Sequence, residues 1–261
     1  MLLLVWKHRS LLAELTKREF SAKYTGSFGG VLWAFLQPLF LLAVYTTAFG
    51  LILKTRWGGS GSATDYAMML FAGLIVFNAF SEVMLKSPAL ITSNPNFVKK
   101  IVFPLELLPV VAVLSALLQA LISVFIWLMG YVVFYGVPHP AALLFPLVLL
   151  VFSPVLLGIG WLFASIGVYV RDLGQLTAML AHMMLFLTPI FYSVDAAPAF
   201  VRKALMLNPL TFVVDQLRLV LFAGTPLSPL PGLMYFGCAC LFAWLTLRCF
   251  RFLRSGFADM V

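Results

Sequence analysis

The stretch LLPVVAVLSALLQALISVFIWLMGYVVFY, residues Leu107–Tyr135, contains no Asp, Glu, Lys or Arg. About 20 mainly apolar residues are enough for a helix to cross the hydrocarbon core of a bilayer. We therefore predict that this stretch forms a membrane-spanning helix.

The composition of the whole chain supports the same interpretation. Of its 261 residues, 63% are hydrophobic and only 10% are charged, and the mean hydropathy is +1.06. Soluble domains average about half apolar and a quarter charged residues. One globular core cannot bury this excess of apolar side chains, so we predict an all-α integral membrane protein.

Five further apolar runs flank the first, which predicts a single six-span transmembrane domain over residues 31–261. In chain order, the six predicted spans are Val31–Leu53, Tyr66–Leu85, Leu107–Tyr135, Ala141–Val170, Gln175–Tyr192 and Leu230–Phe252.

The basic residues between the runs predict the orientation, because cytoplasmic loops of membrane proteins are enriched in Lys and Arg. With the N-terminus inside, twelve of the 17 Lys and Arg residues lie on the cytoplasmic side. Both termini are therefore predicted to be cytoplasmic. The start of the chain, MLLLVWKHRS, lacks the charge-first order of a signal peptide, so we expect it to be retained.

Residues 1–30 form a predicted cytoplasmic segment that contains an interfacial helix over Ser10–Tyr24. Leucine and aromatic residues lie along one face of this helix, and most of its charged residues lie on the opposite face. Two interpretations stay open at this point. The helix is either an ordinary anchor before the first span or a surface helix that also docks a cytoplasmic partner.

Residues 193–229 are apolar but interrupted by Asn208-Pro209, which leaves two halves that are each too short to cross a bilayer. We predict two short re-entrant helices in the outer leaflet, between the fifth and sixth spans. Asp215 and Arg218 are three residues apart on the second of these helices and can therefore pair.

The loop over residues 86–104 interrupts two apolar runs with a polar stretch that carries Lys99 and Lys100. The predicted orientation places it in the cytoplasm, where paired lysines can contact anionic lipid headgroups. The alternative is that these lysines act only as a topology signal at the end of a span.

Motifs for enzymatic chemistry are missing from the sequence. It contains no phosphate-binding loop, no His/Cys/Asp cluster with metal spacing and no serine nucleophile motif. His182 and the three cysteines fit packing roles, and Glu82 and Glu106 fit interfacial or capping roles. The net charge of +8 is not gathered into a nucleic-acid-binding patch. We predict a protein that is not an enzyme, with no metal, no cofactor of its own and no nucleic-acid partner.

Aromatic residues make up 15% of the chain. Aromatic faces can contact the C–H faces of sugars, so Tyr45 and Phe49 in the first span, with Phe186, Phe191 and Tyr192 in the fifth, could line a sugar path. Helical spacing alone favours core packing for the same residues.

Five motifs follow one another along the chain. The first is KYTGSFGGVLW at residues 23–33, with Gln37-Pro38-Leu39 after it, and the second is NPNFVKKIVFPLE at residues 94–106. The others are Arg171-Asp172-Leu173, Thr188-Pro189-Ile190-Phe191-Tyr192 and Asn208-Pro209-Leu210. In this order and spacing they resemble the ABC-2 type permeases that export O-antigen, capsule or teichoic acid chains, and the resemblance covers nearly the whole chain.

The resemblance implies a homodimer in the bacterial inner membrane that exports a lipid-linked polysaccharide. Two copies of a separate ATPase subunit would dock beneath it and bind ATP and Mg²⁺. The implied residues for ATPase coupling and headgroup contact are Lys17, Arg18, Lys23, Tyr24, Asn94, Asn96, Lys99, Lys100, Arg171 and Asp172. The implied glycan channel contains Trp33, Tyr45, Phe49, Phe186, Phe191 and Tyr192, and the implied outer gate contains Asn208, Pro209, Asp215 and Arg218.

Three other functions are considered as alternatives. An ABC-2 permease for a small hydrophobic drug would share the same architecture. A membrane enzyme of glycan assembly would need an acid, metal or nucleophile constellation, and a purely structural scaffold would not account for the five motifs.

Overall fold

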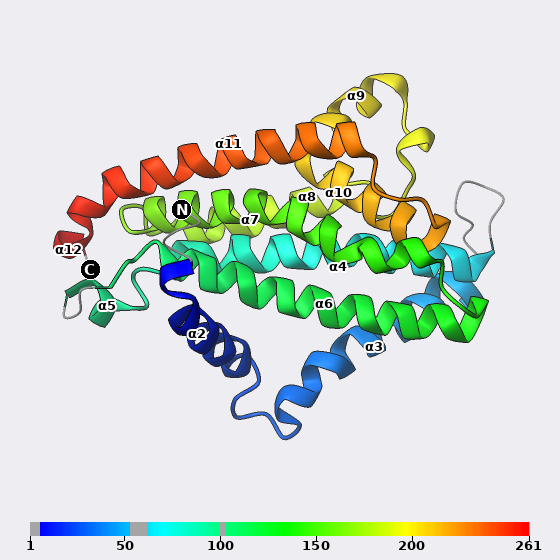
Figure 1. Ribbon diagram of the computed structural model, residues 1–261, viewed down its shortest axis with the longest axis horizontal. Helices are drawn as coiled ribbons and strands as arrows, with labels where there is room; N and C mark the ends of the chain where they lie inside the picture. The colour runs from blue at the N-terminus through cyan, green and yellow to red at the C-terminus, as the bar shows by residue number, and fades with distance from the viewer. Residues whose placement is uncertain (1–5, 53–61, 100–102, 261) are drawn as a thin grey trace.

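The computed structural model describes residues 6–52, 62–99 and 103–260, and every regular element within these ranges is helical. The long helices run side by side along the longest axis of the molecule (Figure 1). The predicted all-α fold is confirmed for the part of the chain that the structure describes.

Five helical segments in the described ranges are long and apolar enough to cross a membrane, and they correspond to five of the six predicted spans. The segments are Gly30–Phe49, Thr64–Ala89, Leu107–Tyr135, Pro140–Gly167 and Pro229–Gly256. Their main α-helices are α3 (Trp33–Tyr45), α4 (Ala63–Lys86), α6 (Leu107–Tyr135), α7 (Phe145–Gly167) and α11 (Pro229–Leu253).

The predicted fifth span, Gln175–Tyr192, is a shorter helix than the sequence suggests. Helix α8 (Leu173–Leu187) has 15 residues, which gives a length of about 22 Å at 1.5 Å per residue. The helix ends because Thr188 precedes a proline and adopts an extended conformation, with φ −98° and ψ 138°. The remaining apolar residues of the run therefore lie in the following turn.

The segment between α8 and α11 contains two short helices that meet almost at a right angle. Helix α9 (Ala199–Leu207) and the continuous segment Pro209–Ala223 are bent by 93° at Asn208. This segment begins with α10 (Pro209–Arg218), and the Asn208 side chain caps it by accepting a hydrogen bond from the Leu210 amide at 2.9 Å. If this bent pair is counted as one broken span, the described residues contain six candidate spans.

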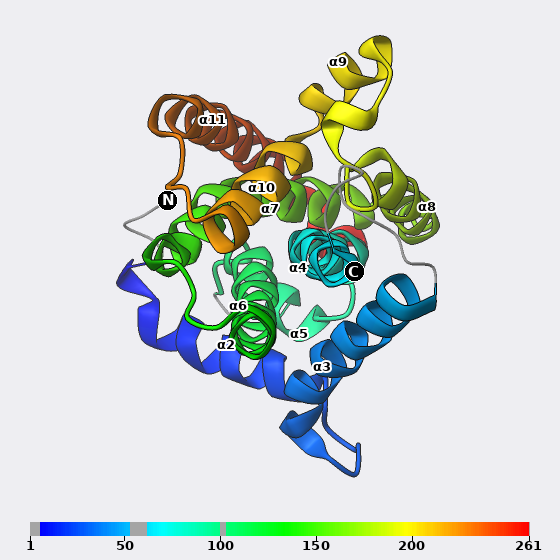
Figure 2. The same ribbon diagram turned by 90° about the vertical axis from the view of Figure 1, so that its right-hand side faces the viewer.

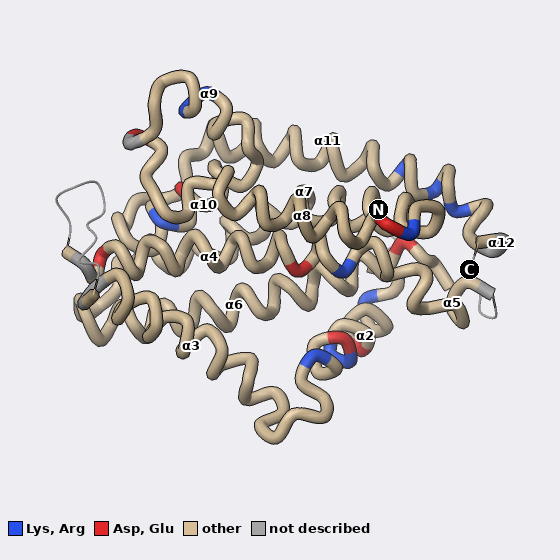
Figure 3. Tube along the Cα trace, turned by 180° about the vertical axis from the view of Figure 1, so that it is seen from behind, with Lys and Arg blue, Asp and Glu red and all other residues tan. Residues whose placement is uncertain are grey.

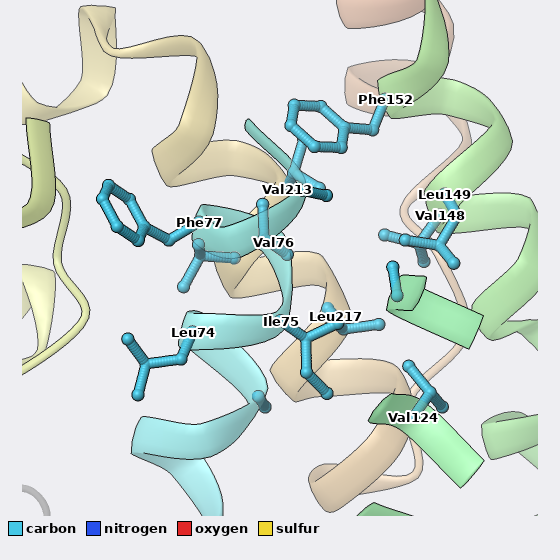
Figure 4. Packing of buried hydrophobic residues seen from close by; sticks show 14 of the residues in the cluster. Leu74, Ile75, Val76, Phe77, Val124, Val148, Leu149, Phe152, Val213 and Leu217 are labelled. Carbon is cyan, nitrogen blue, oxygen red and sulfur yellow. The ribbon is translucent and has the colours of Figure 1, made fainter. Parts of the chain in front are cut away.

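Helix α4 occupies the centre of the bundle, with α3, α6, α7, α8 and α10 around it (Figure 2). In the core, Ile75 and Val76 of α4 lie among side chains of α7 and α10 (Figure 4). Trp127 links α6 to α4, because its indole donates a hydrogen bond to the Met68 carbonyl at 2.9 Å.

Helix α2 (Arg9–Ala22) lies across one end of the bundle and buries Leu12 and Thr16 against it (Figure 2). Two short helices, α5 (Pro95–Lys99) and α12 (Phe257–Met260), lie toward the same end (Figure 1). Lys and Arg residues of α2 and of the last turns of α11 are also found there (Figure 3). We call this end, formed by α2, α5 and α12, the basic end.

Candidate functional site

The basic end contains most of the residues that the sequence assigns to coupling. Arg18 of α2 and Asn94, which precedes α5, line the same cavity of about 240 Å³ between α2, α5 and α6. Lys17 and Asn96 are exposed at this end. Lys99 is the last residue of α5, and Lys100 lies outside the described residues.

An ion-pair network joins the end of α2 to α4. The Lys23 ammonium lies 2.6 Å from the Glu82 carboxylate, and the Lys86 ammonium lies 2.7 Å from Glu19 and 3.7 Å from Glu82. The Lys23 and Glu82 side chains are only 16% and 21% exposed. Burial lowers the pKa of Lys23, and the neighbouring Glu82 carboxylate opposes this shift.

Tyr24 extends this network to the first span. Its hydroxyl donates a hydrogen bond to Gln119 of α6 at 2.7 Å, and the Gln119 amide donates to the Ala34 carbonyl of α3 at 3.0 Å. Lys23, Tyr24 and Gln119 line a cavity of about 400 Å³ that also contains Gln37. The end of α2 is therefore connected to α3, α4 and α6 by polar contacts.

Arg171 and Asp172 lie apart from this network. Both are exposed in the turn before α8, and the Asp172 side chain makes no capping hydrogen bond there. The structure thus brings Lys23 and Tyr24 together around one cavity and Arg18 and Asn94 around another, whereas Arg171 and Asp172 join neither.

Glu82 and Glu106 each form ion pairs that the sequence does not predict. Glu82 accepts the ion pairs described above, and Glu106 lies 3.5 Å from Arg251 and 3.1 Å from Arg254 of the C-terminal region. The spacing of Glu82 and Lys86, four residues apart on one helix, signals their pairing. No local spacing links Glu82 to Lys23 or Glu106 to the two arginines.

The two groups of candidate channel aromatics lie close to each other at the opposite end. The rings of Tyr45 and Phe49 are 6.2 Å apart, and Phe49 is 5.2 Å from the ring of Tyr66. The Tyr66 hydroxyl donates a hydrogen bond to the Phe191 carbonyl at 2.8 Å. Tyr66, which the sequence assigned to no site, therefore connects the first span to the turn after α8.

Of the remaining channel candidates, three contact one another and one lies apart. The Phe186 and Phe191 rings stack with centroids 5.9 Å apart, and the Tyr192 hydroxyl donates to the Phe186 carbonyl at 3.0 Å. Trp33 is separate from this group, at the start of α3 beside Gly29.

The guanidinium of Arg218 holds the turn after α8 against α4. It donates hydrogen bonds to the carbonyls of Met69 (2.9 Å), Pro189 (2.7 Å) and Ile190 (2.8 Å). The predicted pairing with Asp215 is present at 3.9 Å. Arg218 is 5% exposed, so it satisfies three backbone acceptors in a part of the core from which water is largely excluded.

Asn208 holds the same turn from the other side. Its amide donates hydrogen bonds to the Leu187 carbonyl at 3.1 Å and to the Thr188 hydroxyl at 3.0 Å. The motif residues 188–192 and Asn208-Pro209, which are separated in sequence, are therefore joined at the bend between α9 and α10. We call this assembly of residues 188–192, α9 and α10 the outer bend.

The model of the family described as "ABC-2 type transporter" matches residues 10–222. The chain belongs to this family. Its matched region includes the network at the basic end and the whole outer bend. As a member of the ABC-2 type transporter family, the chain is a multi-pass membrane protein and a transport subunit of an ABC transporter that works with a partner ATPase.

Curated relatives agree with this assignment over nearly the full length. The chain is 25% identical over 259 residues to "O-antigen export system permease protein RfbA" of Myxococcus xanthus, covering 98% of this chain and 97% of the relative. Two proteins of that name from Klebsiella pneumoniae are 23% and 24% identical, over 253 and 216 residues. These alignments cover 96% and 82% of this ABC-2 type transporter chain and 95% and 81% of the relatives.

Within the described residues, no group of three or more His, Cys, Asp or Glu side chains is arranged to hold a metal ion. His182 lies beside its own helix backbone, with Nδ1 2.7 Å from the Ala178 carbonyl oxygen. The geometry of this ABC-2 type transporter is that of a bundle with a polar network at one end and a bent helix pair at the other.

Proposed function

We propose that the chain is the permease subunit of an exporter that moves a lipid-linked polysaccharide across the bacterial inner membrane. The proposed polysaccharide is O-antigen. The observation that carries this proposal is the alignment with O-antigen export permeases over 97% of a relative's length. Two copies of the chain form the channel. Two copies of a separate ATPase subunit bind ATP and Mg²⁺ and supply the energy.

In this proposal the basic end faces the cytoplasm, as do both termini, and α2 is the interfacial helix that receives the ATPase. The network from Lys23 through Glu82 to Lys86 supports this role, because it joins α2 to the central helix α4. A displacement of α2 would therefore act on the core of the bundle. The described residues 86–99 of the predicted coupling loop lie beside α2, and this loop is the second coupling surface.

The outer bend is the proposed gate on the opposite side of the membrane. A re-entrant position of α9 and α10 is supported by their 93° bend and by the shortness of each helix. Non-helical backbone within a membrane is tolerated where it is buried in protein or lines a water-filled cavity. Hydrogen bonds from Arg218 and Asn208 satisfy the backbone of residues 187–190 in this way.

Replacing both Lys99 and Lys100 by glutamine is expected to reduce export, because the two ammonium groups meet the phosphates of the lipid-linked substrate or of anionic lipids. Each lysine near an anionic surface contributes about 1 kcal/mol, so binding is weakened roughly 30-fold. Surface glycan should be measured together with protein level and membrane orientation, which stay unchanged. Lys203→Gln on α9 is the control, and export equal to that of the control would contradict this role.

Replacing Tyr45 and Phe49 by alanine tests the proposed channel. We expect glycan export to fall roughly 30-fold, since the two aromatic contacts contribute about 1 kcal/mol each. ATPase activity of the assembled transporter should be retained. Phe40→Ala with Val44→Ala has the same spacing on the more exposed side of α3. If both double variants export equally, Tyr45 and Phe49 serve in packing only.

The first test of the proposed function is mass spectrometry of proteins that co-purify with the chain from gently solubilised native membranes. An ATPase with a phosphate-binding loop, recovered in equal amount, is the expected result. Deletion of the chain should also leave completed O-antigen inside the cell. Altered drug sensitivity with normal surface glycan would favour a drug exporter, and turnover by the purified chain alone would favour an enzyme of glycan assembly.

A further inference from the structure

A groove of about 700 Å³ lies between α4, α7, α8 and α11, with the outer bend at one end of it. None of the described residues that line it is charged. Four of the chain's 11 methionines are in its wall, which is otherwise mostly aliphatic and aromatic. The four are Met84, Met184, Met206 and Met234. Methionine side chains are flexible and polarizable, so they adapt to apolar ligands of irregular shape.

The hydrogen-bonding side chains of Asn208 and Tyr235 in the wall are already bonded within the protein. Asn208 donates to the Leu187 carbonyl and to the Thr188 hydroxyl, and it accepts from the Leu210 amide. The Tyr235 hydroxyl donates to the Pro209 carbonyl at 2.9 Å. A ligand in the groove would therefore meet hydrocarbon surfaces rather than free hydrogen-bonding groups.

The groove is elongated in the direction of the helices. Its lining runs from Met234 to Phe242 on α11 and from Val155 to Phe163 on α7. Eight residues of an α-helix rise by about 12 Å, so the lining extends over about this length. This length is close to the ~15 Å thickness of the hydrocarbon layer of one leaflet. Because α7 and α11 follow the long axis of the bundle (Figure 1), the groove is roughly parallel to the lipid chains of a surrounding membrane.

The mouth of the groove is accessible from outside the bundle. Met206 and Met234 at its edge are each 66% exposed, and Leu207 is 86% exposed. Its inner wall is closed, because Gly158 allows the ring of Phe242 to lie directly on the backbone of α7. In a membrane this mouth borders hydrocarbon. Water in so apolar a site would lack hydrogen-bonding partners, and an empty groove would lose packing contacts.

We propose that this groove binds one linear hydrocarbon chain of a membrane lipid. The chain is an acyl chain of a membrane phospholipid, because the lining of the groove extends over about 12 Å, close to the ~15 Å hydrocarbon depth of one leaflet. An occupant would touch α9 at Met206 and α11 at Met234 at the same time, and so would brace the outer bend against the last span. This site goes beyond the proposed export function and does not depend on what is transported.

Photolabelling of the full chain with its partner ATPase in lipid nanodiscs tests this site. One sample contains phosphatidylethanolamine with a diazirine at the end of one acyl chain, and a second contains a diazirine-labelled polyprenyl phosphate. The expected result is labelling of groove residues such as Met84 and Leu180 rather than the exposed α11 residues Leu241 and Trp244. Unlabelled phosphatidylethanolamine should compete for the site, and labelling that only unlabelled polyprenyl phosphate displaces would contradict the assignment to a phospholipid acyl chain.

A matched pair of cysteines on α11 supplies the variants. Cys238 lines the groove, and Cys240, two residues away, is exposed and is not part of the lining. Cys238→Phe should reduce groove labelling about tenfold because the added ring occupies the site, and Cys240→Phe should leave it unchanged. Met234→Trp at the mouth, with Leu233→Trp as its control, repeats the test at exposed positions where folding is not at risk.

Two results would overturn the proposal. Labelling of Leu241 and Trp244 as strong as that of the groove, and equal in all variants, would show ordinary lipid contact. Efficient cross-linking of Cys238 between two copies of the chain, with no lipid labelling, would show that a second copy covers the groove. Neither result depends on glycan export, so a failure here is distinguishable from a failure of the proposed function.

Discussion

Replacing Arg218 by methionine is expected to lower the free energy of unfolding by about 3–6 kcal/mol, because the buried carbonyls of Met69, Pro189 and Ile190 each lose a donor. The thermal midpoint of the detergent-solubilised chain should fall by roughly 10 °C. Export should fall with it, since the turn after α8 would no longer be held against α4.

Arg202→Met is the control for this substitution. Arg202 donates to the Asp195 carbonyl at 2.7 Å, but its side chain is 39% exposed, so water can replace the lost bond. Arg218→Lys should give an intermediate result, because an ammonium cannot reproduce the planar fork of three donors. Equal midpoints for Arg218→Met and Arg202→Met would contradict the role assigned to Arg218.

Replacing Glu82 by glutamine is expected to cost about 1–3 kcal/mol, because the largely buried Lys23 ammonium would lose its nearest countercharge. The loss should also depend on pH. Without Glu82, burial would lower the pKa of Lys23 further below its ordinary value of 10.5. At pH values between the lowered pKa of Lys23 in the folded variant and its pKa of 10.5 in the unfolded chain, the unfolded chain binds more protons. The stability of the variant therefore rises with pH, and the loss of stability caused by the substitution is smaller near pH 10 than near pH 7.

Thermal unfolding of the variant at several pH values measures both effects. Glu14→Gln, an exposed substitution on α2, is the control. The double variant Lys23→Met with Glu82→Leu should recover part of the lost stability, since replacing a buried pair by apolar side chains is often neutral. A Glu82→Gln midpoint equal to that of Glu14→Gln at pH 7 would show that the ion pair does not hold α2 on α4.

The sequence predicts the long helices well because each needs only a sustained apolar run. Five predicted spans correspond to helices of spanning length. The run Gln175–Tyr192 is an instructive exception, because hydropathy continues past Leu187 although the helix does not. Pro189 gives a local signal for this end, and the residue before it turns away from the helix.

The sites are less predictable because their contacts join residues that are far apart in the chain. The pairing of Asp215 with Arg218 follows from their spacing and is confirmed, but at 3.9 Å it is longer than the three hydrogen bonds that Arg218 donates. Its three shorter hydrogen bonds reach backbone carbonyls up to 149 residues away. Every residue carries a backbone carbonyl, so the sequence does not show which carbonyls accept hydrogen bonds from Arg218. Only the three-dimensional structure shows this arrangement.

The ion pair between Glu106 and Arg254 can form only late in the synthesis of the protein. They are 148 residues apart, and α6, α7, α8 and α11 are all synthesised between them. The Glu106 carboxylate therefore lacks both arginines until α11 has been synthesised. A nascent chain that stops before Arg251, or that inserts its last helix in the opposite direction, would leave Glu106 without these two arginines, which would distinguish unfinished molecules from complete ones.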